Sequence, residues 1–231
     1  MSTKYTINTL ELTMTTSNNA INECVILLHG LARSAHSMDK MADKLAEHGY
    51  KVLNIDYPSR AYSIEELAEQ TITDALKQCQ GMPVNFVTHS MGGILVRQFL
   101  SKHSIDKLNK VVMLGPPNKG TEIVDKLRHL PGFSFVNGAA GMQLGTGELS
   151  VPNQLGKANF DVGIIAGTQS INLLLSSLIP DTDDGKVSVE STKIDGMNDH
   201  IEMPTTHVFM MRNDAVIAQV ICYLKQGQFN H

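Results

Sequence analysis

The stretch that decides the fold lies at residues 84–96 and reads VNFVTHSMGGILV. Its first part, residues 84–88, is a run of mainly β-branched and aromatic residues with the length of a buried strand. An apolar helical pattern follows at once, with Ser90 at the corner between the two. Such a strand-to-helix corner is typical of a nucleophile elbow, in which a sharp turn exposes the serine hydroxyl above a sheet. The turn needs very small neighbours, which explains Gly92 and Gly93.

The rest of the chain alternates short β-branched runs with amphipathic helical segments. This alternation predicts an α/β fold with a mostly parallel central sheet flanked by helices on both faces. We expect strands over residues 25–28, 51–55, 84–88, 110–114, 162–166 and 206–210. Helices are expected over residues 38–45, 63–80 and 216–224, the second of which begins with a capping-box pair, Ser63 and Glu66.

Composition favours a single folded domain over residues 1–231. Hydrophobic residues make up 42% of the chain and charged residues 18%, which gives no compositional case for disorder. A formal net charge of -4, with 19 scattered Lys and Arg residues, argues against a nucleic-acid partner. No apolar run approaches the ~20 residues that span a bilayer, so lipid contact is expected to be peripheral at most. Residues 1–23 lack the apolar core of a signal peptide, which predicts a cytoplasmic protein.

The three cysteines, Cys24, Cys79 and Cys222, are far apart in the sequence and lack the spacing of zinc ligands. We expect them to be buried thiols, with a disulfide between Cys24 and Cys79 as the alternative if the protein is exported. The aspartates between residues 181 and 199 lack EF-hand spacing. No metal and no cofactor are therefore expected.

One region, residues 119–159, breaks the alternation. It contains seven glycines and several apolar residues without a clear period. It is too long for an ordinary connection in a compact domain, so we interpret it as a cap or lid inserted over a site. A disordered linker is the alternative. Four apolar residues argue against that alternative, namely Phe133, Phe135, Met142 and Leu144.

From residue 24 to the C-terminus the chain resembles the bacterial lipase and esterase branch of the α/β-hydrolase superfamily. Four segments carry the resemblance: LHGL at 28–31, THSMG at 88–92, DDGKV at 183–187 and THVF at 206–209. The sequence departs from the usual G-x-S-x-G pattern at Thr88, where a β-branched residue replaces the first glycine. The resemblance implies an α/β-hydrolase fold and a serine hydrolase that cleaves carboxylic esters through an acyl-enzyme.

The resemblance also implies roles for individual residues. Ser90 is the expected nucleophile, and the backbone amides of Leu31 and Met91 are the expected oxyanion-hole donors. The order nucleophile, acid, histidine places the general base late in the chain, where His207 is preferred over His200. We expect His29 to hold its loop and not to react.

The acid that orients the histidine is not fixed by spacing. Five aspartates lie in the right stretch: Asp181, Asp183, Asp184, Asp195 and Asp199. The resemblance favours Asp184, because the lipases that this chain resembles carry the acid in an Asp-Gly pair followed by a β-branched residue. Asp183 is the next choice, and a simple Asp-Gly turn is the third interpretation.

The substrate is less clearly predicted. An apolar run at residues 171–175 could line an acyl pocket or form a core helix. A small-molecule acyl ester or a lipid is the expected substrate, and lipase and short-chain esterase remain open. A thioesterase or acyltransferase would use the same triad, and a non-catalytic binding domain is a more remote alternative. A haloalkane dehalogenase is disfavoured because it needs aspartate in place of Ser90. The oligomeric state stays open.

Overall fold

A computed structural model of the chain describes residues 21–171 and 173–231. Residues 1–20, which entered the prediction of a cytoplasmic protein, and Asn172 of the apolar run lie outside the described residues. The described part contains a parallel sheet of six strands in the order β2-β1-β3-β4-β5-β6. The strands are β1 (Cys24–Leu28), β2 (Lys51–Ile55), β3 (Val84–His89), β4 (Leu108–Leu114), β5 (Val162–Gly167) and β6 (Asp199–Met203). This confirms the predicted α/β-hydrolase architecture.

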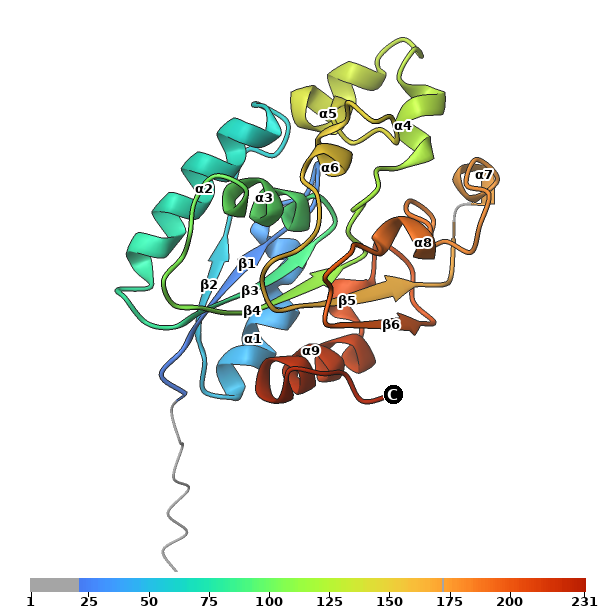
Figure 1. Cartoon of the computed structure of the whole chain (residues 1–231). Coiled ribbons are helices and arrows are strands. Elements are labelled where there is room, and N and C mark those ends of the chain that lie inside the picture. Colours follow the sequence, from blue (N-terminus) through green and yellow to red (C-terminus); the bar gives the residue numbers. More distant parts are fainter. Residues whose placement is uncertain (1–20, 172) are drawn as a thin grey trace, which may run out of the picture.

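Helices cover both faces of the sheet (Figure 1). One face carries α2 (Ile64–Gln78) and α3 (Met91–Leu100), and the other carries α1 (Asp39–Glu47) and α9 (Asp214–Gln226). Successive side chains of a strand point to opposite faces. In β1, Ile26 therefore packs with α2 and α3, whereas Val25 and Leu27 pack with α1 and α9. This two-sided burial explains why the inner strands β1 and β5 are almost continuous apolar runs.

The predicted capping box starts α2. The amide of Glu66 donates to the Ser63 hydroxyl at 3.3 Å, and the Glu66 carboxylate accepts from the Ser63 amide at 3.0 Å. Two otherwise unpaired amides at the helix start are thereby satisfied. The helix ends at Gln78, two residues earlier than the pattern predicted.

The predicted strand at residues 206–210 is wrong. The last strand is β6 (Asp199–Met203), and residues 206–209 form a turn that leads into a short 3-10 helix, η2 (Met210–Arg212). β6 pairs only with β5, so it is an edge strand with polar residues along it and lacks the apolar run of the inner strands. The later apolar residues at 210–211 are buried in the core from a helix instead.

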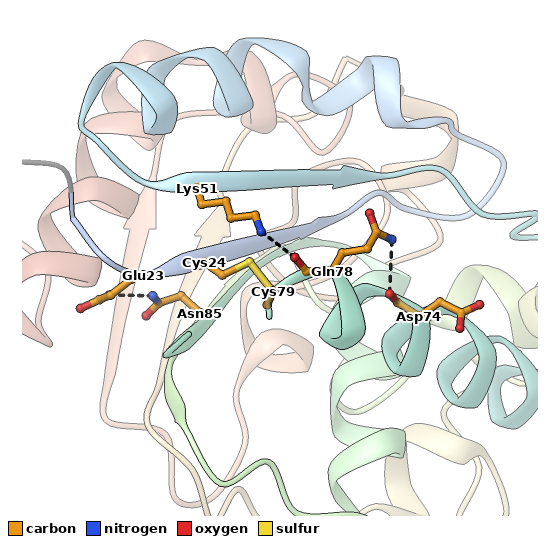
Figure 2. The surroundings of a disulfide bond; sticks show 7 residues. All are labelled: Glu23, Cys24, Lys51, Asp74, Gln78, Cys79 and Asn85. Atoms are coloured by element: carbon orange, nitrogen blue, oxygen red, sulfur yellow. Dashed lines mark hydrogen bonds between the residues drawn. A yellow bond between two sulfur atoms is a disulfide. The ribbon is translucent and has the colours of Figure 1, made fainter. Parts of the chain in front are cut away.

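The expectation of free thiols is wrong for two of the three cysteines. Cys24, the first residue of β1, forms a disulfide with Cys79 at the C-terminal end of α2 (Figure 2). Both residues are buried, and Cys222 is free. At the same end of the sheet, the Lys51 ammonium donates to the carbonyl of Gln78 at 2.6 Å. The disulfide thus fixes α2 to the edge of the sheet where the strands begin.

Residues 119–159 contain three short helices, α4 (Glu122–Leu127), α5 (Phe133–Met142) and α6 (Val151–Gln154). We call these residues the α4–α6 segment; Figure 1 shows α4 and α5 apart from the helices that cover the sheet. Arg97 of α3 is buried and binds the chain at both ends of this segment. Its guanidinium donates to the carbonyls of Asn118 at 3.0 Å, Pro152 at 3.0 Å and Gly156 at 2.8 Å.

Two more short helices, α7 (Leu173–Ser176) and α8 (Val189–Thr192), lie between β5 and β6. None of the helices in the described ranges combines the length and apolar composition needed to cross a bilayer.

Candidate active site

Ser90 occupies a strained turn between β3 and α3. Its φ of 53° and ψ of -122° fall in a region that non-glycine residues rarely adopt. A Cβ atom at position 92 would lie 2.6 Å from the carbonyl oxygen of Leu28, so only glycine fits there. At position 93 it would lie 3.2 Å from the hydroxyl of Thr88, so Gly93 leaves room for the β-branched residue that departs from the usual motif.

The imidazole of His207 lies between Ser90 and Asp184. His207 Nε2 is 3.0 Å from Ser90 Oγ, and His207 Nδ1 is 2.6 Å from Asp184 Oδ2. Because a carboxylate only accepts, the hydrogen belongs on Nδ1 and leaves the Nε2 lone pair facing the serine hydroxyl. This tautomer is the one that can take a proton from Ser90.

Backbone amides of the same loop hold the Asp184 carboxylate in place. Asp184 Oδ1 accepts from the amides of Lys186 at 3.0 Å and Val187 at 2.9 Å, and its carbonyl accepts from the His207 amide at 2.8 Å. Asp183 turns away, and its carboxylate accepts from the Ser176 hydroxyl and the Gly185 amide. Among the five candidate aspartates, Asp184 is therefore the one that reaches His207.

The other candidate base, His200, lies elsewhere. It belongs to β6, and its Nε2 is 3.0 Å from the Thr192 hydroxyl. The structure brings Ser90, Asp184 and His207 together without it. All three follow the carboxyl ends of strands, where open α/β sheets hold their ligands.

The two expected oxyanion-hole residues lie near the serine: Leu31 lines the same cavity as Ser90, and Met91 follows Ser90 directly in the chain. Gly30 packs so closely that a Cβ atom there would lie 3.1 Å from Ser90 Cβ. No acceptor within the described part of the chain binds either amide, so both are available to a ligand. The loop is held by His29, whose Nε2 accepts from the Tyr57 amide at 3.3 Å and whose ring stacks on Tyr57 at 4.1 Å.

His89 is a residue whose part in the site the sequence did not reveal. Its Nε2 donates to the carbonyl of His207 at 2.9 Å, and the two rings lie 4.8 Å apart. Burial, and then the proximity of His207, lowers the pKa of His89 well below its usual value, so it stays neutral. His89 therefore positions the His207 backbone. The only sequence signal was its place directly before Ser90.

A cavity of about 210 Å³ opens over Ser90 and His207. The α4–α6 segment supplies much of its apolar wall through Ile123, Val124, Leu127, Phe133 and Leu144. Leu175 of α7 also lines it, whereas Ile171 and Leu174 are exposed, so the core-helix interpretation of residues 171–175 is wrong for these two. Two cationic residues, Arg33 and Lys186, complete the lining. Neither residue could be assigned to the site from sequence: Arg33 lies in no motif, and the DDGKV segment that contains Lys186 points only to its aspartates.

Comparison with known proteins agrees with this architecture. The family described as the α/β hydrolase fold matches residues 23–135. The mature form of the Bacillus licheniformis lipase BlEst2 superposes with a TM-score of 0.69 and 18% identity, covering 87% of this chain and 91% of the lipase. A Listeria innocua protein, the product of gene lin2722, gives 0.60 and 18%, covering 91% and 99% of the two chains. Together these matches show that the chain has the α/β-hydrolase fold.

Two further matches are partial. The phospholipase PlaB of Legionella pneumophila superposes with a TM-score of 0.60 and 18% identity over 74% of this chain and 45% of PlaB. A Mycobacterium phage D29 protein, provisionally named a non-heme haloperoxidase, is 31% identical over 86 residues. The match spans 31% of that curated relative's length. At these identities the solved structures establish the fold alone.

Proposed function

We propose that this chain is a serine hydrolase that cleaves carboxylic esters, with Ser90 as nucleophile, His207 as general base and Asp184 as the orienting acid. The observation that carries the proposal is the unbroken chain of contacts from Asp184 through His207 to Ser90 at the strained turn. The hydrolase fold and the lipase and phospholipase among its structural neighbours support the same class.

The proposed reaction has two steps. Ser90 Oγ attacks the ester carbonyl while His207 Nε2 takes its proton, and the amides of Leu31 and Met91 bind the oxygen that becomes negative. The alcohol then leaves with the proton from His207. In the second step His207 activates a water molecule that releases the acid from Ser90.

The cavity supports an apolar acyl group as the substrate's acid part. Its walls are mostly apolar, and the α4–α6 segment that forms them acts in this proposal as the cap of a single hydrolase domain. Comparing the rates of hydrolysis of 4-nitrophenyl butyrate and 4-nitrophenyl palmitate distinguishes a short-chain esterase from a lipase. A parallel assay with acyl-CoA tests the thioesterase alternative.

The test of the proposed function is hydrolysis of 4-nitrophenyl butyrate by matched variants. Ser90→Ala, His207→Gln and Asp184→Asn should each lower kcat by roughly a thousandfold or more. The controls His200→Gln and Asp181→Asn change the same residue types outside the contact chain and should stay within about threefold of wild type. Turnover by Ser90→Ala near the wild-type rate, or a lack of labelling of Ser90 by a fluorophosphonate, would overturn the proposal.

The compartment is a separate part of the proposal. The sequence prediction of a cytoplasmic protein stays a prediction. The disulfide between Cys24 and Cys79 favours an oxidising compartment instead, because such bonds are rare in reducing cytosol. Thiol counting on protein isolated from its native cell under alkylating conditions decides between the two.

A further inference from the structure

Two cations share the cavity with the proposed nucleophile. Arg33 follows the loop of Leu31, and its amide donates to the carbonyl of Gly30 at 3.2 Å. Lys186 belongs to the loop of Asp184, and its carbonyl accepts from the Thr121 hydroxyl at 2.7 Å. The backbones that carry these two charges are therefore fixed to the same loops that hold the proposed oxyanion donor and the acid.

Neither cation has a carboxylate partner among residues 21–171 and 173–231. Within these ranges neither the Arg33 guanidinium nor the Lys186 ammonium group forms an ion pair or a hydrogen bond, and Lys186 is bonded through its backbone alone. The carboxylate of Asp184 is already engaged by His207 and by two backbone amides. Asp56, which lines a neighbouring groove with Arg33, accepts instead from the Ala35 amide at 2.9 Å.

The two charges act on each other. Lys186 is an exposed residue, yet the surrounding protein desolvates its ammonium group. This desolvation and then the charge of Arg33 lower the pKa of Lys186, against a smaller opposing effect of the Asp184 charge. The chain as a whole is negative, with a formal net charge of -4, so this is a local concentration of positive charge. The repulsion between two unpaired cations that line one cavity is lowered when an anion binds there.

The cavity itself indicates where that anion lies. Val124 and Leu144 are buried in its apolar wall, whereas Arg33 and Lys186 are exposed and so lie where the cavity meets solvent. An apolar acyl chain suits the buried wall, and an anion there would lack partners. The charged group therefore belongs to the alcohol part of the ester, which stays at the opening.

We propose that Arg33 and Lys186 form a subsite for a compact anionic group, a phosphate or carboxylate, on the alcohol part of the ester. The inference rests on the proposed function and narrows its substrate class to acyl esters of anionic alcohols, such as acylated glycerol phosphates. Ser90 forms the acyl bond, the ester C–O bond breaks, and the anionic alcohol leaves with the proton from His207. The phosphate or carboxylate group itself is unchanged.

The test compares two esters that differ in charge, 1-octanoyl-glycerol 3-phosphate and 1-octanoylglycerol, both used as monomers. Wild type should prefer the phosphate ester by roughly tenfold in kcat/KM. Arg33→Gln and Lys186→Gln should each lower that preference roughly fivefold, and Lys186→Arg should restore it. The control Arg128→Gln removes an exposed charge of the α4–α6 segment that does not line the cavity and should leave the preference unchanged.

Three results would overturn the inference. Equal kcat/KM for both esters in wild type contradicts it, as does a preference that Arg33→Gln and Lys186→Gln leave intact. An equal loss in Arg128→Gln shows a general surface charge in place of a subsite. In each of these cases Ser90-dependent hydrolysis of 1-octanoylglycerol still supports the proposed function. If wild type hydrolyses neither these esters nor 4-nitrophenyl butyrate, the proposed function fails as well.

Discussion

Reducing the disulfide between Cys24 and Cys79 should destabilise the folded chain strongly. The bond joins residues 55 positions apart, and closing a loop of that size in the unfolded chain corresponds to ~4 kcal/mol of unfolding free energy. Both sulfurs are buried, so as thiols they keep most of their packing in the folded state. The loss therefore arises mainly from the greater freedom of the unfolded chain, and for a protein of this size it lowers Tm by about 10 °C.

The assay is urea unfolding followed by far-UV circular dichroism, with and without reductant. Thiol titration of the unfolded protein should count one free thiol before reduction and three after it, given the three cysteines of the chain. The double variant Cys24→Ala, Cys79→Ala should resemble the reduced protein and show no further response to reductant.

The control is Cys222→Ala, which removes the free cysteine and should keep the full difference between oxidised and reduced protein. Two results would refute the reasoning. One is three titratable thiols in unreduced, unfolded protein. The other is an unfolding midpoint that reductant leaves unchanged although the thiol count rises.

Three further predictions concern the elbow, the buried arginine and the buried histidine. Gly92→Ala should slow fluorophosphonate labelling of Ser90 at least tenfold, because the added Cβ would lie 2.6 Å from the carbonyl oxygen of Leu28. The control Gly147→Ala, which has open space around it, should be labelled at the normal rate. Arg97→Met should lower the unfolding free energy by about 2–4 kcal/mol in urea, because buried carbonyls lose their donors; an unchanged midpoint contradicts this. Burial keeps the pKa of His89 well below its ordinary 6.5 in the folded protein, so below pH 6.5 only the unfolded chain gains that proton. Stability should therefore fall by about 1 kcal/mol between pH 6.5 and 5.5 from this group alone, and His89→Asn should show a correspondingly shallower decline.

The inner strands could be predicted from sequence because both of their faces are buried. β1 is apolar at every position, and β3 contains Val84, Phe86 and Val87 in a run that is buried throughout. β6 could not be predicted in the same way. As an edge strand it contains Asp199, His200 and Glu202, and its pairing depends on a neighbour that local pattern does not reveal.

The candidate site shows the same division. The turn at Ser90 could be predicted because strand, glycines and helix are adjacent in the chain. The choice of Asp184 over Asp183 rested on resemblance, and its contact with His207 depends on how the loop turns. Arg33 and Lys186 come from loops far apart in sequence, so their meeting at one cavity follows only from the fold.

The buried Arg97 of α3 also limits how the cavity over Ser90 can change over evolutionary time. Because it holds residues 118, 152 and 156, the stretch between them is a loop with fixed endpoints. Insertions, deletions or replacement of residues within that stretch can reshape the cavity wall while the attachment points stay where they are. A library that varies only residues 122–150 would therefore change the cavity wall, and with it the substrates accepted, while the rest of the fold stays the same. The same anchoring confines any opening movement to the middle of the stretch.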